Sequence, residues 1–232
     1  MTTPSDARTA VLARIRASIG VTGKEPLRRA AVADRLAGRP RGVIPETARV
    51  EGAARLAAFA EKVVTTMASF EAVATAAEVP MAVAAYLAGR NLPAEIRHGA
   101  DPRLASLPWS GTMLAVSTGR SDGRDPVGVS HAEAGIAETG SVVLVSGPDN
   151  PTTLNFLPET HVVVVDAADI VGGLEDAMAR IRARFGAGVM PRTVNFVTGP
   201  SRSADIEQKL LYGAHGPKRL HVIMVGVGDG GG

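Results

Sequence analysis

The sequence predicts an α/β fold built on a parallel or mixed β-sheet. Two patterns alternate along the chain: short runs of branched apolar residues, and longer segments whose apolar residues recur every three or four positions. His161–Val165 is an unbroken run of the kind found in a strand covered on both faces. Ala167–Phe185 has the clearest helical periodicity, and Gly186 follows it as a residue suited to end a helix.

Residues 1–44 are predicted to form a basic helical arm and linker. Ser5–Ile19 reads as an amphipathic helix because three apolar residues recur at four-residue spacing and Ser5 can cap it. Gly20–Pro45, rich in Arg, Gly and Pro, is expected to be an extended linker. Met1–Arg41 holds nine Lys/Arg against three Asp/Glu, a local charge of +6, so the remainder carries −4. Because no aromatic residues are interleaved with these charges, we interpret the arm as solvated or as a docking segment for a protein partner rather than as a nucleic-acid-binding segment.

Residues 45–227 are predicted to form the α/β domain, and residues 228–232 a flexible tail. A helix is expected over Pro45–Ser69, with Leu56, Phe59, Val63 and Met67 on its apolar face, and another over Val79–Ala88. The other predicted strands are apolar segments between turn residues: Glu71–Thr75, Ala94–Arg97, Thr112–Ser117, Asp125–Ser130, Ser141–Val145, Thr193–Thr198 and Leu220–Val225.

Composition excludes several kinds of chemistry. The chain has no cysteine, so it can form no disulfide, no cysteine nucleophile and no thiolate-held iron–sulfur cluster. No spacing typical of a metal site is present, and we expect no metal. No run reaches the roughly 18 apolar residues of a membrane span. Met1–Gly20 lacks the continuous apolar centre of a secretory signal, so a cytoplasmic location is expected.

Val197–Pro217 is the most informative stretch for function. It is predicted to leave a strand, turn at Gly199 and Pro200, form a short helix from Ser201 to Gly213 and lead into the next strand. Backbone N–H groups and the dipole at a helix start favour an anion. We expect this stretch, like Ala134–Ser141, to lie at the carboxyl ends of the sheet strands, where ligands bind in such folds.

Candidate ligand-binding residues in these two stretches share small size, a hydroxyl or a charge: Thr139, Gly140, Ser141, Gly199, Pro200, Ser201, Arg202, Ser203, Asp205 and Gly216. Arg202 can give a two-pronged hydrogen bond to a carboxylate or phosphate. The structural alternative is that the hydroxyls only make turns and caps, and that Asp205 pairs with Arg202 or caps the helix. His215 can act as acid, base or ligand near neutral pH, whereas His161 opens a buried strand and is interpreted as structural.

Four motifs in order resemble the lactate-utilisation (LUD) domain family, and within it the LutC/YkgG branch. They are AGIAETGSVVL at Ala134–Leu144, Pro158–His161 leading into a strand, GPSRSADIEQ at Gly199–Gln208, and GAHGP at Gly213–Pro217. The resemblance implies a Rossmann-like fold of the NagB/RpiA/CoA-transferase-like type. It also implies a role in oxidising L-lactate to pyruvate beside cysteine-rich and iron–sulfur partner proteins, so that clusters are expected only on those partners and no cofactor in this chain.

Three functions follow as alternatives. The first is a non-redox subunit of a lactate-oxidising system that binds a small anion at residues 134–141 and 199–217. The second is a stand-alone acyl-CoA transferase-like or sugar-phosphate enzyme, with Glu138 as nucleophile or base, since a loop glutamate attacks a thioester in the related transferases. The third is a scaffold or regulatory protein that docks through its basic arm. Glu138 has a structural alternative too, as a loop cap or as the partner of an arginine.

Overall fold

The computed structural model describes residues 4–186, 188–206 and 209–227; at residues 4–5, 204–206 and 209–210 it describes only the backbone. The predicted tail at 228–232 lies outside the described residues. The chain divides into two compact units, Met1–Val43 and Ile44–Gly232, which we describe separately.

The first unit contains two helices, α1 (Pro4–Ser18) and α2 (Pro26–Gly38). The prediction of a helix near the start is confirmed, but the prediction of an extended linker over Gly20–Pro45 is wrong. Pro26 stands at the first turn of α2, where a missing N–H costs nothing, and the residues that follow are mostly Leu, Arg and Ala. The Gly and Pro residues that suggested a linker flank this helix.

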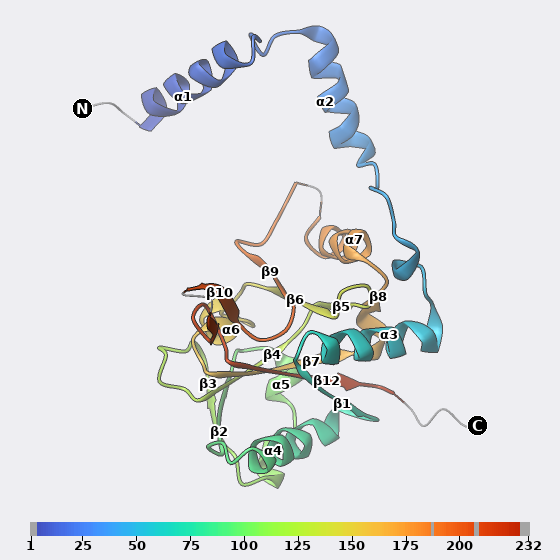
Figure 1. The fold of residues 1–232 in the computed structure, drawn as a ribbon, viewed down its shortest axis with the longest axis vertical. Helices are drawn as coiled ribbons and strands as arrows, with labels where there is room; N and C mark the ends of the chain where they lie inside the picture. Colours follow the sequence, from blue (N-terminus) through green and yellow to red (C-terminus); the bar gives the residue numbers. More distant parts are fainter. Residues whose placement is uncertain (1–3, 187, 207–208, 228–232) are drawn as a thin grey trace. The chain divides into compact units, whose positions relative to one another are not determined.

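The second unit is built on a six-stranded parallel sheet in the order β1-β12-β7-β4-β2-β3 (Figure 1). Every pairing in this order is parallel, which confirms the predicted fold class. The strands are β1 (Ser69–Val73), β2 (Glu95–His98), β3 (Ala115–Thr118), β4 (Val127–His131), β7 (Thr160–Asp166) and β12 (Arg219–Val225).

A second sheet has four strands in the order β8-β5-β6-β9. They are β8 (Ile170–Val171), β5 (Ala134–Ile136), β6 (Ser141–Val145) and β9 (Val194–Val197), and all pair antiparallel except β5 with β8. Each face of β6 contacts a different core: Val142 and Leu144 pack with the main sheet, whereas Val143 and Val145 pack with α7 (Leu174–Phe185).

Helices complete a layered arrangement (Figure 1). On one face of the main sheet, α4 (Val79–Gly89) buries Val83 and Leu87 against the strands. On the other face, α3 (Gly52–Thr65) buries Phe59 and Val63 beside the second sheet. Two short helices, α5 (Pro102–Ala105) and α6 (Thr152–Phe156), lie in connections at opposite ends of β4.

Two helix boundaries differ from the prediction. The helix expected from Ala167 begins at Leu174, because Gly172 and Gly173 precede it and Ile170–Val171 pairs with β5 as a strand. The helix expected over Pro45–Ser69 is shorter as well. It ends at Thr65, so Met67 lies beyond it with a positive φ of 70° and is exposed rather than on the buried face.

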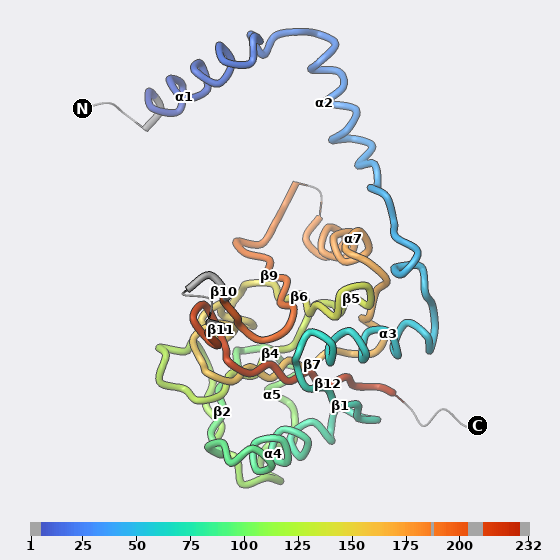
Figure 2. The backbone as a smooth tube through the Cα atoms, viewed as in Figure 1, coloured from blue at the N-terminus to red at the C-terminus, as the bar shows by residue number. Residues whose placement is uncertain are grey.

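The short helix predicted after Ser201 does not form. The backbone makes an antiparallel hairpin of β10 (Arg202–Ile206) and β11 (Lys209–Tyr212), with Glu207 and Gln208 outside the described residues. Figure 2 traces the chain from β9 through this hairpin into β12. Backbone hydrogen bonds from Ser201 N to Pro217 O and from Gly213 N to Ser201 O close its base, at 2.9 Å each. The helix dipole invoked for anion binding is therefore absent from this stretch.

Candidate anion-binding site

A cavity of about 310 Å³ lies at the amino ends of β7 and β12. Four segments line it: the end of α6, the start of β7, residues 196–202 and residues 215–217, together with Leu220 of β12. The prediction that Val197–Pro217 lies at the carboxyl ends of the strands is wrong. Because the hairpin runs directly into β12, this stretch approaches the main sheet at the end where β12 begins.

The inner wall of the cavity contains a chain of buried polar side chains. His161 Nε2 lies 3.0 Å from Ser130 Oγ, and Ser130 Oγ donates a 2.9 Å hydrogen bond to Asn155 Oδ1. His161 and Asn155 line the cavity, and both are fully buried. Burial lowers the pKa of His161 to about 3, so its ring is neutral at physiological pH.

Arg202 supplies the positive charge in the cavity lining. Its guanidinium contacts Met67 Sδ at 2.7 Å and Thr66 O at 3.4 Å, so the end of α3 positions it. Among the described side chains, which do not include that of Asp205, no carboxylate forms an ion pair with Arg202. Ser201 Oγ accepts a 3.2 Å hydrogen bond from the backbone N–H of His215, which places Ser201 and His215 together in the lining.

Gly199 fixes the turn that brings these residues to the cavity. Its φ is 73°, a conformation that costs other residues free energy. A Cβ at this position would lie 2.2 Å from Thr66 O. Pro200 and Gly216 line the cavity beside it, and Gly216 faces Phe156 and Ser201. Ser203 lies in β10, as does the backbone of Asp205, whose side chain is outside the described residues.

The Ala134–Ser141 stretch forms the β5–β6 hairpin and does not line this cavity. The hairpin is nevertheless connected to the cavity, because Ser141 Oγ lies 2.5 Å from Oγ1 of Thr198, a cavity residue. Ser141 Oγ also lies 2.6 Å from Thr139 Oγ1 within the turn. Gly140 has a φ of 68°, and a Cβ there would lie 2.5 Å from the carbonyl carbon of Lys62 in α3. The hydroxyls and the glycine thus contribute first to packing of the turn.

Glu138 is directed away from the cavity residues. Its backbone N–H donates to Gly172 O at 3.0 Å, and its carboxylate lies beside Gly173, the residue that precedes α7. A carboxylate beside the start of a helix is a stabilising arrangement. The structure therefore joins His215 with residues 199–202 and 216 at one cavity and separates Glu138 from them.

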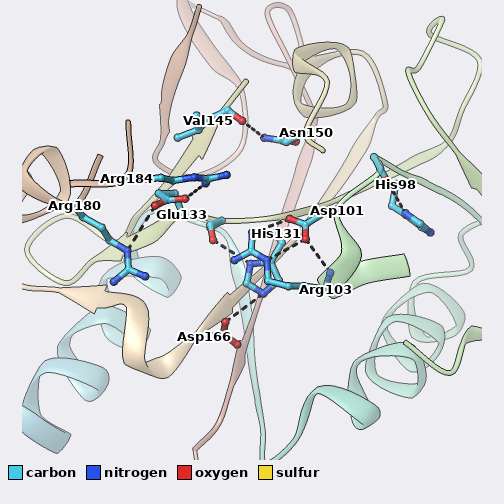
Figure 3. A network of polar contacts seen from close by, with 12 residues as sticks. His98, Asp101, Arg103, His131, Glu133, Val145, Asn150, Asp166, Arg180 and Arg184 are labelled. Atoms are coloured by element: carbon cyan, nitrogen blue, oxygen red, sulfur yellow. Dashed lines mark hydrogen bonds and ion pairs between the residues drawn. The ribbon is translucent and has the colours of Figure 1, made fainter. Parts of the chain in front are cut away.

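The carboxyl ends of the strands carry a different polar network (Figure 3). His131 at the end of β4 lies between the Asp101–Arg103 pair and Asp166, with Nε2 at 3.5 Å from Asp166 Oδ2. Burial first, and then the charge of Arg103, lowers the pKa of His131. Glu133 pairs with Arg184 and Arg180 nearby. These charges neutralise one another, which is typical of a structural network.

Sequence reasoning interpreted Asn155 as a turn residue, within a loop (Gly147–Pro158) that could border the pocket, and interpreted His161 as structural only. The available signal was a histidine at the start of an otherwise branched apolar run, since a polar side chain buried there needs a partner. The described residues contain no group of three or more His, Asp or Glu side chains arranged to hold a metal.

Residues 117–225 match the family model of the LUD domain. Curated relatives include lactate utilization protein C of Geobacillus thermodenitrificans, 41% identical over 100 residues, and that of Bacillus subtilis, 40% identical over 100 residues. Each alignment covers 43% of this chain and 42% of the relative. The chain therefore matches less than half the length of these relatives.

A solved structure of a DUF162 family protein from Deinococcus radiodurans has the same fold. Its TM-score is 0.56 at 23% identity, and the match covers 76% of this chain and 99% of that chain. No helix in the part of the chain that the structure describes is both long enough and apolar enough to cross a membrane.

Proposed function

We propose that this chain acts in lactate utilisation as a non-redox subunit that binds a small carboxylate in the cavity beside Arg202. The observation that carries the proposal is the guanidinium of Arg202, which lines a small cavity and has no carboxylate partner among the side chains that the structure describes. The names of the curated relatives support the lactate part of the proposal.

The chemistry of the cavity suits a monocarboxylate of a few heavy atoms. Arg202 offers a planar pair of donors to two carboxylate oxygens, and the Ser201 hydroxyl can donate to one of them. Phe156 and Leu220 supply an apolar surface for a methyl group. Since the chain has no cysteine, we propose that iron–sulfur and cysteine-rich partner proteins carry the electrons taken from lactate. Co-purification of those partners with a tagged chain tests this second part.

Isothermal calorimetry of the purified chain with L-lactate, pyruvate and phosphate tests the binding proposal. Arg202→Ala is compared with Arg120→Ala, which removes the same charge from a position outside the cavity lining. Loss of a charge-assisted hydrogen bond costs about 1.5–3 kcal/mol, so we expect lactate to bind about tenfold to hundredfold more weakly to Arg202→Ala. Equal affinities of the two variants would contradict the site. Saturable binding of coenzyme A instead would favour the acyl-CoA enzyme.

A further inference from the structure

Two polar atoms, in residues that line the cavity, have no hydrogen-bond partner among the described residues. They are His161 Nδ1 and Asn155 Nδ2, and both are buried. Leaving a buried polar group unpaired costs about 1–3 kcal/mol, so each such atom in a folded protein calls for a partner. Both residues line the cavity that Arg202 also lines.

The hydrogen bonds between these side chains fix what each unpaired atom offers. The only hydrogen of Ser130 Oγ is donated to Asn155 Oδ1, so the contact between Ser130 Oγ and His161 Nε2 requires Nε2 to carry the hydrogen. In a neutral ring, His161 Nδ1 is then a pure acceptor. Asn155 uses its oxygen on Ser130, so its unpaired Nδ2 is a donor.

We propose that the relay His161–Ser130–Asn155 determines specificity for a 2-hydroxycarboxylate over the corresponding 2-oxo acid. The ligand hydroxyl donates its hydrogen to His161 Nδ1, while Asn155 Nδ2 donates to a neighbouring ligand oxygen. A 2-oxo acid has only an acceptor at the same position and would face the lone pair of Nδ1. Solvent reaches neither nitrogen in the structure, so the proposal requires the side chains at the cavity wall to shift when the ligand binds. The neutral ring at physiological pH, with its pKa of about 3, keeps Nδ1 free as an acceptor.

This inference rests on the proposed function, and the test separates the two. L-lactate, pyruvate and propionate have the same charge and similar size, and differ in a hydroxyl, a carbonyl or neither beside the carboxylate. Their affinities are measured by calorimetry for the wild type, His161→Gln and His161→Asn. The glutamine amide can occupy the place of Nε2 and keep the bond to Ser130, whereas the asparagine amide can occupy the place of Nδ1.

We expect the wild type to bind lactate about tenfold more tightly than pyruvate or propionate, which is the effect of one hydrogen bond. His161→Gln should lower lactate affinity to the level of propionate, and His161→Asn should retain a preference for lactate. If the wild type binds lactate and pyruvate equally, or His161→Gln keeps the preference, the relay is wrong while carboxylate binding stands. If none of the three acids binds, the proposed function fails as well.

A measurement on the wild type avoids dependence on how the variants fold. Nitrogen-15 NMR of labelled histidine distinguishes an imidazole protonated at Nε2 from one protonated at Nδ1 or at both. The relay requires the Nε2–H form for His161 at neutral pH and a change at Nδ1 when L-lactate is added. A ring that carries its hydrogen on Nδ1, or an Nδ1 signal unchanged at saturating lactate, would overturn the inference.

Discussion

Ser141 Oγ lies 2.5 Å from Thr198 Oγ1, and this contact joins the two sequence motifs that suggested a ligand site. Ser141 starts β6, and Thr198 follows β9, its antiparallel neighbour. The Glu-Thr-Gly turn before Ser141 packs on α3 and faces the start of α7, whereas the segment after Thr198 lines the cavity. The Glu-Thr-Gly turn therefore supports the segment after Thr198, and in our proposal only that segment contacts a bound ligand.

Glu138→Gln should leave the affinity for L-lactate within about twofold of the wild type, because the Glu138 carboxylate lies beside Gly173 and not in the cavity. Stability should fall by less than about 1 kcal/mol, the usual value of a charge at a helix start. Calorimetry and urea unfolding measure the two quantities. Loss of lactate binding in a folded Glu138→Gln protein would revive the enzyme alternative with Glu138 at its centre.

Gly140→Ala should destabilise the domain by about 3 kcal/mol, from a strained positive φ and from the collision with the Lys62 backbone. Gly52→Ala is the matched control. Gly52 has a φ of 55°, and a Cβ at this position would meet no atom within 4 Å, so the variant should lose only about 1 kcal/mol. Urea denaturation compares the two variants. Equal losses would mean that the contact between the turn and α3 is not tight.

Acidification should destabilise the fold through its buried histidines. Burial lowers the pKa of His161 to about 3 and of His221 to about 4, from a usual value of 6.5. Below that value the unfolded chain binds protons that the folded protein excludes, so stability is fully present above pH 6.5 and falls as pH drops toward the folded values. Between about pH 7 and about pH 5.5 we expect a loss of about 2 kcal/mol from the two rings together.

Urea unfolding at both pH values checks this dependence. His161→Gln should show a loss smaller by about 1 kcal/mol over the same interval, because the variant removes the contribution of the His161 ring. A wild-type stability that is unchanged or higher at the lower pH would contradict the burial of neutral imidazoles.

Glu133→Gln should cost about 2 kcal/mol or more, since the Glu133 carboxylate is buried and pairs with both Arg180 and Arg184. Glu159→Gln is the control. Glu159 is an exposed carboxylate that pairs with Lys218, and such surface pairs contribute about 0–1 kcal/mol. Thermal or urea unfolding should therefore show a clearly larger loss of stability for Glu133→Gln than for Glu159→Gln. Similar small losses would show that the Glu133 pairs contribute no more than surface pairs.

The sequence predicted the central strands well because unbroken branched runs such as His161–Val165 fit few other environments. It failed where a short apolar pattern suits two structures. The segment Arg202–Ile206 is too short for its sequence pattern to distinguish a helix from a strand. In the structure, the backbone hydrogen bonds of Ser201 with Gly213 and Pro217 stabilise the hairpin. The helix α2 was missed because its Gly- and Pro-containing flanks dominated the composition of the segment.

The candidate site could be predicted only in part for a related reason. Gly199–Arg202 and His215–Pro217 are close in sequence, and their turn residues and charges identify them. Asn155 and His161 join them through the pairing of β7 with β4 and β12, and through a serine on the neighbouring strand. Such contacts depend on strand order, which local patterns do not encode.

We propose that a small carboxylate binds beside Arg202 and not at the other polar regions of the domain. The claim is tested by titrating nitrogen-15-labelled protein with L-lactate and following each backbone amide. We predict saturable shifts of the backbone amides of Ser201, Arg202, His215 and Gly216, with small changes at Glu138 and His131. Shifts centred on Glu138, or on the network around His131, with none at Arg202, would contradict the claim.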